Sequence, residues 1–386
     1  MSSDNRATKL AAPGVRRLGC ICAEVHRQNR LAGSLPKSRR RVYAHARCGR
    51  KCSAREKKSM RSIRLMLLAP LAFFAALIST ASAQEDAASF PSKPIRLIIG
   101  FGAGGGNDLV ARIVGPKVSE LLGQPVVVEN KPGAAGQISV TYAQSQPADG
   151  YTLVVGAIGQ LAIAQTIYPN LPFHPTKTLV PLTLLGSYWL ALAASPKYGI
   201  NSVKELVAFA KANPDKSNYP SSSPAFTIPS ELLKLKTGMP GTLIPYKSTN
   251  EMMLSIAAGQ TLFGFSDPPI VLPLAQGGKV KVLAMTGPNR LPELPDVPTM
   301  AEAGFGNVEV RQQWIGAFAV AGTPPAIIRK LETAFRQALA DPAVREKLKT
   351  VAYTPDGRPG EEFRKLIDDD IKAFGEVVKA AGLKFN

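Results

Sequence analysis

Short apolar runs alternate along this chain with segments of helical periodicity, starting at about residue 95. Residues 95–99 form an apolar run typical of a buried strand, and a glycine-rich stretch follows it. Apolar residues then recur at helical spacing from about Asp108 to Leu122. Gly123 is expected to end that helix, because glycine readily adopts the left-handed backbone found at helix ends. A strand, a glycine loop and a helix therefore open the folded region.

The same alternation continues to the C-terminus. Strands are expected over residues 125–128, 151–155, 263–265 and 280–285. Helices are expected over 136–146, from the cap Ser202 to about 213, over 231–236 behind the cap Ser230, over 249–259, from Pro324 to Leu339 and, as one or two helices, over 361–381. This order predicts an α/β fold with mostly parallel strands.

The first 83 residues have a different character. Residues 60–64 form a basic head, 65–78 an apolar run and 81–83 the small residues Ala-Ser-Ala, which is the pattern of a cleaved secretory signal. The apolar run is shorter than the roughly 20 residues that span a membrane. We therefore expect a signal peptide over 60–83 and export to the periplasm. Residues 1–59 lack periodicity and are expected to be disordered or a mis-called upstream extension.

Charge and reactive side chains restrict the possible functions. The formal charge is +19, but residues 1–83 account for +15 of it, so the remaining chain is nearly balanced and no nucleic-acid partner is expected. All four cysteines lie within residues 1–59, at spacings that only superficially suggest zinc. Beyond residue 83 the one histidine is His174, which lies between prolines in an expected surface loop. We expect neither a catalytic centre nor a metal site.

The glycine loop at residues 100–108 is the main candidate for chemistry. Gly100, Gly102 and Gly105 fit the G-x-G-x-x-G spacing of dinucleotide-binding proteins, and Glu129 ends the next expected strand. An exported NAD(P)-type Rossmann oxidoreductase is therefore one interpretation. It would have to find its cofactor outside the cytoplasm, which weighs against it.

A more general interpretation follows from the physics of such loops. Glycines leave backbone N–H groups accessible, and the N-terminus of the following helix is electropositive, so the loop suits a carboxylate as well as a phosphate. The loop lacks a lysine at P-loop spacing, which argues against a nucleoside triphosphate. A tight turn without any ligand is the third interpretation.

Several segments together resemble one protein family. They are residues 91–96, 101–108, 123–133, 149–153, 245–247, 283–287, 294–299 and 321–324. In these segments the chain is similar to the Bug-type receptors, the extracytoplasmic solute-binding proteins of tripartite tricarboxylate transporters, and the resemblance runs in order through 89–386. It implies a two-lobed periplasmic-binding-protein fold of the type II-like, Venus flytrap kind, with two α/β domains joined by two crossing strands. Lobe 1 would comprise 90–188 plus 312–386, and lobe 2 would comprise 189–311.

The resemblance also implies a function. Such receptors capture a small carboxylate between the lobes, with loop backbone and ordered water, and deliver it to membrane permease subunits. We therefore expect a monomeric binding protein without a cofactor, or alternatively a ligand sensor derived from such a receptor. The implied ligand-binding residues are Phe101, Ala103, Gly104, Gly105, Gly106, Asn107, Asp108, Gly159, Gln160, Ser221, Ser222, Ser266 and Asp267.

This sequence departs from the family pattern at several places, among them residues 221–226, where the family usually has a longer, glycine-rich loop. Gly102 stands where proline is usual, Asn107 where threonine or serine is usual, and the acid common at position 266 is one residue later, at Asp267. Asp108 could contact the ligand or serve only as an acid at the start of its helix. Phe226, near the serines, suggests a more apolar or aromatic acid than is usual.

Overall fold

The computed structural model describes residues 89–168, 170–308, 310–380 and 382. The expected signal peptide at 60–83 and the extension at 1–59 lie outside this part of the chain. Among the helices described, none combines the length and the hydrophobicity that crossing a membrane requires.

Two separate sheets organise the described chain, and a two-stranded ribbon accompanies them. The larger sheet has the order β11-β4-β10-β3-β1-β2, the smaller one β8-β5-β9, and the ribbon pairs β6 with β7. The strands are β1 Ile95–Ile99, β2 Val126–Asn130, β3 Thr152–Ala157, β4 Leu179–Tyr188, β5 Ala191–Ala194, β6 Asn218–Ser221, β7 Thr242–Pro245, β8 Phe263–Ser266, β9 Lys281–Met285, β10 Gln313–Val320 and β11 Thr354–Pro355.

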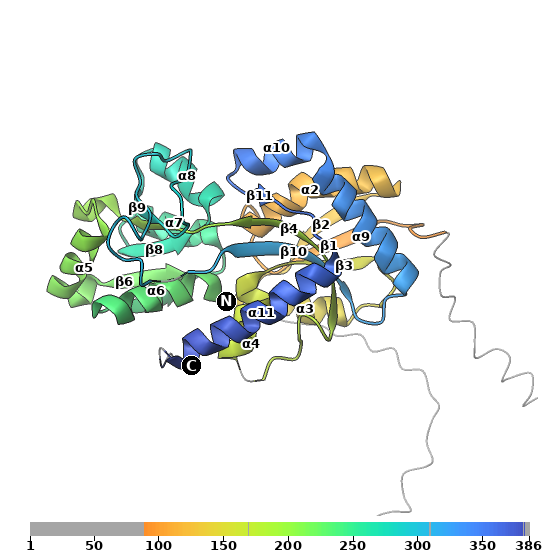
Figure 1. The fold of residues 1–386 in the computed structure, drawn as a ribbon, viewed down its shortest axis with the longest axis horizontal. Coiled ribbons are helices and arrows are strands. Elements are labelled where there is room, and N and C mark those ends of the chain that lie inside the picture. The colour runs from red at the N-terminus through yellow and green to blue at the C-terminus, as the bar shows by residue number, and fades with distance from the viewer. Residues whose placement is uncertain (1–88, 169, 309, 381, 383–386) are drawn as a thin grey trace, which may run out of the picture. The chain divides into compact units, whose positions relative to one another are not determined.

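The expectation of mostly parallel strands is wrong. β1 runs parallel to β2 and β3, and β6 runs parallel to β7. β10 is antiparallel to both β3 and β4, β11 is antiparallel to β4, and β5 is antiparallel to β8 and β9. The chain leaves the larger sheet along β4 and returns along β10, so these two neighbours run in opposite directions (Figure 1).

Helices cover both faces of the larger sheet. α2, α9 and α10 pack together on one face, and α11 lies with α4 on the other (Figure 1). The helices are α2 Gly106–Leu122, α3 Gln137–Gln144, α4 Ala164–Ile167, α5 Val203–Ala212, α6 Pro224–Thr237, α7 Thr249–Ala257, α8 Pro268–Gln276, α9 Pro325–Ala340, α10 Pro342–Thr350 and α11 Gly360–Ala380. The two-lobed α/β fold is thereby confirmed, while the lobe boundaries expected above remain a prediction.

The helix predicted behind Ser230 begins earlier than expected. The side chain of Ser223 accepts a hydrogen bond from the Ala225 amide at 3.3 Å, and Pro224 occupies the first helical position. Both residues favour a helix start there. Ser230 instead lies buried inside α6, where its hydroxyl donates to the Phe226 carbonyl at 2.9 Å.

Two further local predictions are corrected by the structure. Helix α8 was not predicted, because Pro268 and Pro269 at its start are residues that usually interrupt helices. Proline is nevertheless tolerated in a first helical turn. The family resemblance also implies a second loop of the same lobe over residues 156–160, and the structure contradicts it. Strand β3 continues through Ala157, and residues Gly159–Ile163 then form a short π-helix.

The C-terminal helix is fixed to the crossing strand β10 by aromatic packing and a buried acid. The rings of Trp314 and Phe363 meet edge to face with centroids 5.1 Å apart. The Trp314 indole donates to Asp370 Oδ2 at 2.8 Å, and Arg311 Nε donates to Asp370 Oδ1 at 2.6 Å. Burial raises the pKa of Asp370 in spite of these bonds. The Phe363 ring also packs directly against Gly316, since a Cβ at position 316 would overlap the ring.

We expect Gly316→Ala to lower the free energy of unfolding by about 1–3 kcal/mol, the usual effect of overfilling a packed core. Urea-induced unfolding followed by circular dichroism measures this. Gly115→Ala is the matched control, since its Cβ would meet Val126 at an ordinary 3.6 Å within helix α2. That substitution should stabilise the protein by about 0.4–1 kcal/mol. Equal stability of the two variants would contradict the packing described for β10.

Candidate ligand-binding site

The glycine loop between β1 and α2 is held in shape by Asp108. The Gly104 amide, at a left-handed φ of 77°, donates to Asp108 Oδ2 at 2.9 Å, and Arg112 Nε donates to the same oxygen at 2.8 Å. Asn130 Nδ2 donates both to Asp108 Oδ1 at 3.0 Å and to the Phe101 carbonyl at 3.1 Å. Both carboxylate oxygens of Asp108 thus accept hydrogen bonds from the protein.

The same contacts set the pKa of Asp108. Burial by itself would raise the pKa, but the hydrogen bonds from Arg112, Gly104 and Asn130 outweigh burial and bring it below its ordinary value of 3.8. Asp108 therefore stays ionised at neutral pH, beside the positive N-terminus of α2. Of its two expected roles, these bonds support the structural one.

The start of α2 presents the remaining backbone donors of the loop. Gly105 is the N-cap, with an extended backbone, so the amides of Gly106, Asn107 and Asp108 form the first helical turn and have no carbonyl partner within the helix. Asn107 is buried, and its Nδ2 atom has no hydrogen-bond partner. The helix start therefore combines several donors with a positive local potential.

Loops from the smaller sheet and the ribbon region pack closely against this glycine loop. A Cβ on Gly102 would lie 3.0 Å from the Ser248 Cβ, and one on Gly104 would lie 2.9 Å from Asn250 Nδ2. A Cβ on Gly106 would overlap the carboxylate of Asp267, which directly follows β8. The predicted residues Gly106 and Asp267 are therefore neighbours across the two lobes.

Asp267 is a fully buried acid. Its Oδ2 accepts a hydrogen bond from the Tyr353 hydroxyl at 3.1 Å, and its Oδ1 lies 3.3 Å from the Ser266 hydroxyl. The ring of Tyr188 packs edge-on against Tyr353 at 4.8 Å. Burial raises the pKa of Asp267 to about 6, although the two hydroxyl donors favour the ionised form.

Gln160 and Gly159 lie in the π-helix after β3. Gln160 Nε2 donates to the Gly136 carbonyl at 2.7 Å and to the Ser139 hydroxyl at 2.9 Å, whereas its buried Oε1 has no partner. Gly159 adjoins the opposite lobe, since a Cβ there would overlap the Ser223 hydroxyl. Two hydrogen bonds thus fix the Gln160 side chain, and its Oε1 acceptor has no partner.

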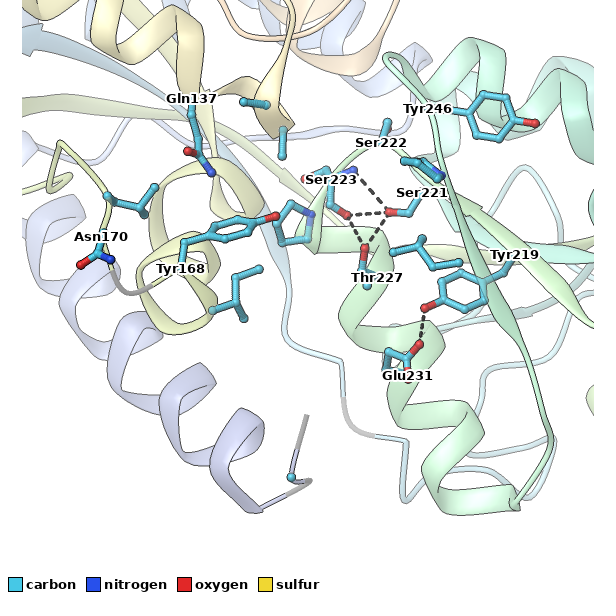
Figure 2. A pocket seen from close by; sticks show the side chains of 18 residues that line it. Gln137, Tyr168, Asn170, Tyr219, Ser221, Ser222, Ser223, Thr227, Glu231 and Tyr246 are labelled. Carbon is cyan, nitrogen blue, oxygen red and sulfur yellow. Dashed lines mark hydrogen bonds between the residues drawn. The ribbon is translucent and has the colours of Figure 1, made fainter. Parts of the chain in front are cut away.

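A cavity of about 1000 Å³ opens between loops of the two lobes, and Ser221 and Ser222 line it (Figure 2). The Ser221 hydroxyl donates to the Ser223 carbonyl at 2.8 Å and accepts from Thr227 at 2.9 Å. The Ser222 hydroxyl oxygen is buried and has no partner. Of the predicted site residues, these two serines belong to the cavity wall, whereas the glycine loop packs against Ser248, Asn250 and Asp267.

Several residues that line the cavity were not predicted from the sequence. From the larger sheet's side come Ala134, Ala135, Gln137 and Tyr168, and Tyr246 stands on the other side (Figure 2). Ala134 and Ala135 adopt left-handed φ angles of 48° and 52°, which alanine rarely takes. Only the glycines around them hinted at an unusual turn, and the sequence offers no sign that the alanines share it.

The cavity carries a single acid, Glu231, among the described residues that line it, and these include no lysine, arginine or histidine. Glu231 accepts a hydrogen bond from Tyr219 and another from Lys234 at 2.8 Å. Burial and this carboxylate raise the pKa of Tyr219, so Tyr219 remains a neutral donor. An anion in this region would therefore be held by neutral donors and helix amides.

Three of the predicted site residues carry buried polar atoms without hydrogen-bond partners. Five such side-chain atoms occur among the described residues, and three of them belong to Asn107, Gln160 and Ser222. Buried polar groups in folded proteins almost always have a hydrogen-bond partner, a ligand or an ordered water. The described residues contain no cluster of side chains suited to a metal ion.

Two α/β lobes joined by paired crossing strands, with glycine and serine loops meeting between them, define a periplasmic-type solute-binding protein. The chain belongs to the tripartite tricarboxylate transporter family of receptors, whose profile matches residues 110–383. This confirms the family resemblance found in the sequence. The family is one of substrate-binding receptors rather than enzymes.

Individual relatives agree with this assignment. The protein BugT of Bordetella pertussis is 33% identical over 322 residues, covering 82% of this chain and 98% of BugT. MatC from Rhodopseudomonas palustris, solved with bound malate, is 28% identical with a TM-score of 0.71, covering 75% of this chain and all of that one. A second R. palustris protein, solved with adipate, is 29% identical with a TM-score of 0.73, covering 76% and 99%.

We expect Asp108→Asn to destabilise the protein by about 1–3 kcal/mol at neutral pH, because the loop loses a charged acceptor that binds three donors. The lowered pKa means that this contribution is present above pH 3.8 and is lost as the pH falls through the pKa of the folded protein. The stability difference from wild type should therefore shrink in acid. Urea unfolding across pH measures it, with the exposed Asp215→Asn as the control variant. A difference that persists undiminished in acid would contradict the role of Asp108 as an ionised acceptor.

Proposed function

We propose that this protein captures a small carboxylate between its two lobes and delivers it to the membrane subunits of a tripartite tricarboxylate-type permease. The observation that carries the proposal is the set of unpartnered polar atoms on Asn107, Gln160 and Ser222. They belong to three separate segments of the chain, and a polar solute or an ordered water between the lobes would satisfy them. The malate and adipate complexes of the two related proteins support a carboxylate as that guest.

The start of α2 is the proposed anchor for the carboxylate. Its free amides and the Asn107 side-chain amide are all donors, and the helix N-terminus favours negative charge. Gln160 Oε1 is an acceptor, so it would pair with a hydroxyl of the solute or with a bridging water. A water bridge is nearly as favourable as a direct hydrogen bond. Phe101, Ala103, Gly104 and Gly105 would border the carboxylate by their position in the loop, since the amides of Gly104 and Gly105 already donate to Asp108 and Gly102.

The remainder of the solute would extend toward the cavity bounded by Ser221 and Ser222. That wall contains Tyr168, Tyr246 and Pro224, and Glu231 is the only charged residue among its described members. Glu231 is already paired with Lys234 at 2.8 Å, so the described wall offers no free cation to a second carboxylate. We therefore propose an acid whose body is uncharged, with apolar or aromatic character balanced by groups that can hydrogen-bond to serine.

The proposal also includes the wider organisation of the chain. Export through the signal peptide at 60–83 would place the mature protein in the periplasm, as a monomer with lobes at 90–188 plus 312–386 and at 189–311. A role as a solute sensor would use the same site, and the contacts described here favour neither role over the other.

The test is a thermal-shift screen of carboxylic acids with the purified protein. A true ligand should raise the melting temperature progressively with concentration, because it binds only the folded state. Gly105→Val should abolish that response while the fold survives, since Gly105 has an ordinary extended backbone and the branched side chain would stand beside the helix amides. Gly115→Ala, ten residues further along in the same helix, is the control and should respond like the wild type. An unchanged response in Gly105→Val would place the ligand elsewhere.

A further inference from the structure

Asp267 forms a buried contact between the two lobes. It follows β8 of the smaller sheet, yet its partner Tyr353 precedes β11 of the larger sheet. The carboxylate also adjoins Gly106 at the start of α2, where a Cβ would overlap both Asp267 Oδ2 and the Tyr353 hydroxyl. Asp267, Tyr353 and Tyr188 have relative exposures of 2%, 1% and 5%. The contact is therefore shielded from solvent, and it exists only while the two lobes are together.

No compensating cation faces this carboxylate within the part of the chain that the structure describes. The titratable groups that face it are Tyr353, through its hydroxyl, and Tyr188, which packs against Tyr353. Burial raises the pKa of both tyrosines well above the ordinary value, so they are neutral. A buried carboxylate that has only neutral donors incurs a desolvation penalty when it ionises. The positive N-terminus of α2 lies beside Asp267 and offsets part of this penalty. With its pKa raised by burial, ionised Asp267 still disfavours contact between the lobes, and protonated Asp267 permits it.

Binding of a carboxylate at the proposed solute site would also favour the protonated form of Asp267. A carboxylate bound at the amides of Gly106 and Asn107 would lie next to Asp267, and two adjacent negative charges in a buried site repel each other. Protonation of Asp267 removes this repulsion and leaves a neutral carboxyl group that can also donate a hydrogen bond.

We propose that Asp267 takes up a proton when the lobes close in mildly acidic solution, with Tyr353 as its positioning residue, so that closure and solute binding are coupled to protonation. The solute half of this coupling rests on the proposed function, whereas the closure half rests on the contact alone. In the open protein the carboxyl group would be hydrated and would return to its ordinary acidity.

The direction of the pH dependence follows from these two states. The pKa of Asp267 is about 6 in the contact described and 3.8 ordinarily, so closure is favoured by protons. Its equilibrium constant should rise about tenfold for each pH unit as the pH falls from about 6 toward 4, and should level off above pH 6. A bound anion beside Asp267 would move this window upward.

The test follows lobe closure in the protein without added solute, as the radius of gyration from small-angle X-ray scattering between about pH 4 and pH 8. The wild type should become more compact as the pH falls. Asp267→Asn, a neutral isostere, should be compact throughout. Tyr353→Phe keeps the carboxyl group but removes a donor that favours its ionised form, so its midpoint should move to higher pH. The exposed Asp296→Asn is the control and should follow the wild type.

Retention of the pH response in Asp267→Asn, or its absence in the wild type, would overturn the proposal. Tyr353→Phe tests it independently, because an unmoved midpoint would also exclude Asp267 as the titrating group. Benzoate, a monocarboxylate with an apolar body, used as a probe in thermal shifts at acidic and neutral pH, separates the two proposals. Binding that is equally strong at both pH values would contradict the proton coupling and leave the proposed function standing. Failure of every carboxylate at any pH, with closure still dependent on pH, would refute the proposed function alone.

Discussion

The antiparallel pairing of β4 with β10 is the constraint on which the rest of this structure depends. The two strands carry the chain out of the larger sheet and back into it, and the lobes can share a site only because both crossings are side by side. Trp314, Phe363 and Asp370 then fasten the C-terminal helix to the returning strand. Rigid lobes with paired connections favour hinge motion over local unfolding as the means of admitting a solute.

The loops at the junction differ in how they satisfy their polar groups. Asp108 uses both oxygens to hold the glycine loop, and Gln160 uses its amide nitrogen to fix the turn beside Gly136. Asn107, Ser222 and the Gln160 oxygen are left buried without partners. The groups that hold the loops in shape thus have hydrogen-bond partners within the protein, whereas neighbouring groups do not. This is the arrangement expected of a preorganised binding site.

Local patterns in the sequence predicted most elements that depend on local chemistry. Gly123 does end α2 in a left-handed conformation, and Ser202 does cap α5 through Glu205. The family resemblance predicted the two crossing strands, but their antiparallel direction was missed because strand direction depends on distant partners. Helix α8 was missed because proline looks like a helix break. In the site, the glycine loop was identifiable from its composition. The Asp267–Tyr353 contact was not, since its partners are separated by 86 residues and no local spacing relates them.

The left-handed alanines at positions 134 and 135 have an energetic consequence. An alanine in this backbone conformation costs roughly 1–2 kcal/mol relative to the right-handed form, and glycine would relieve much of that strain. The turn therefore contains two alanines at positions where glycine would have a lower conformational energy. Because both alanines line the cavity, their methyl groups make it narrower and more apolar than a glycine turn would, at the cost of local strain in the backbone.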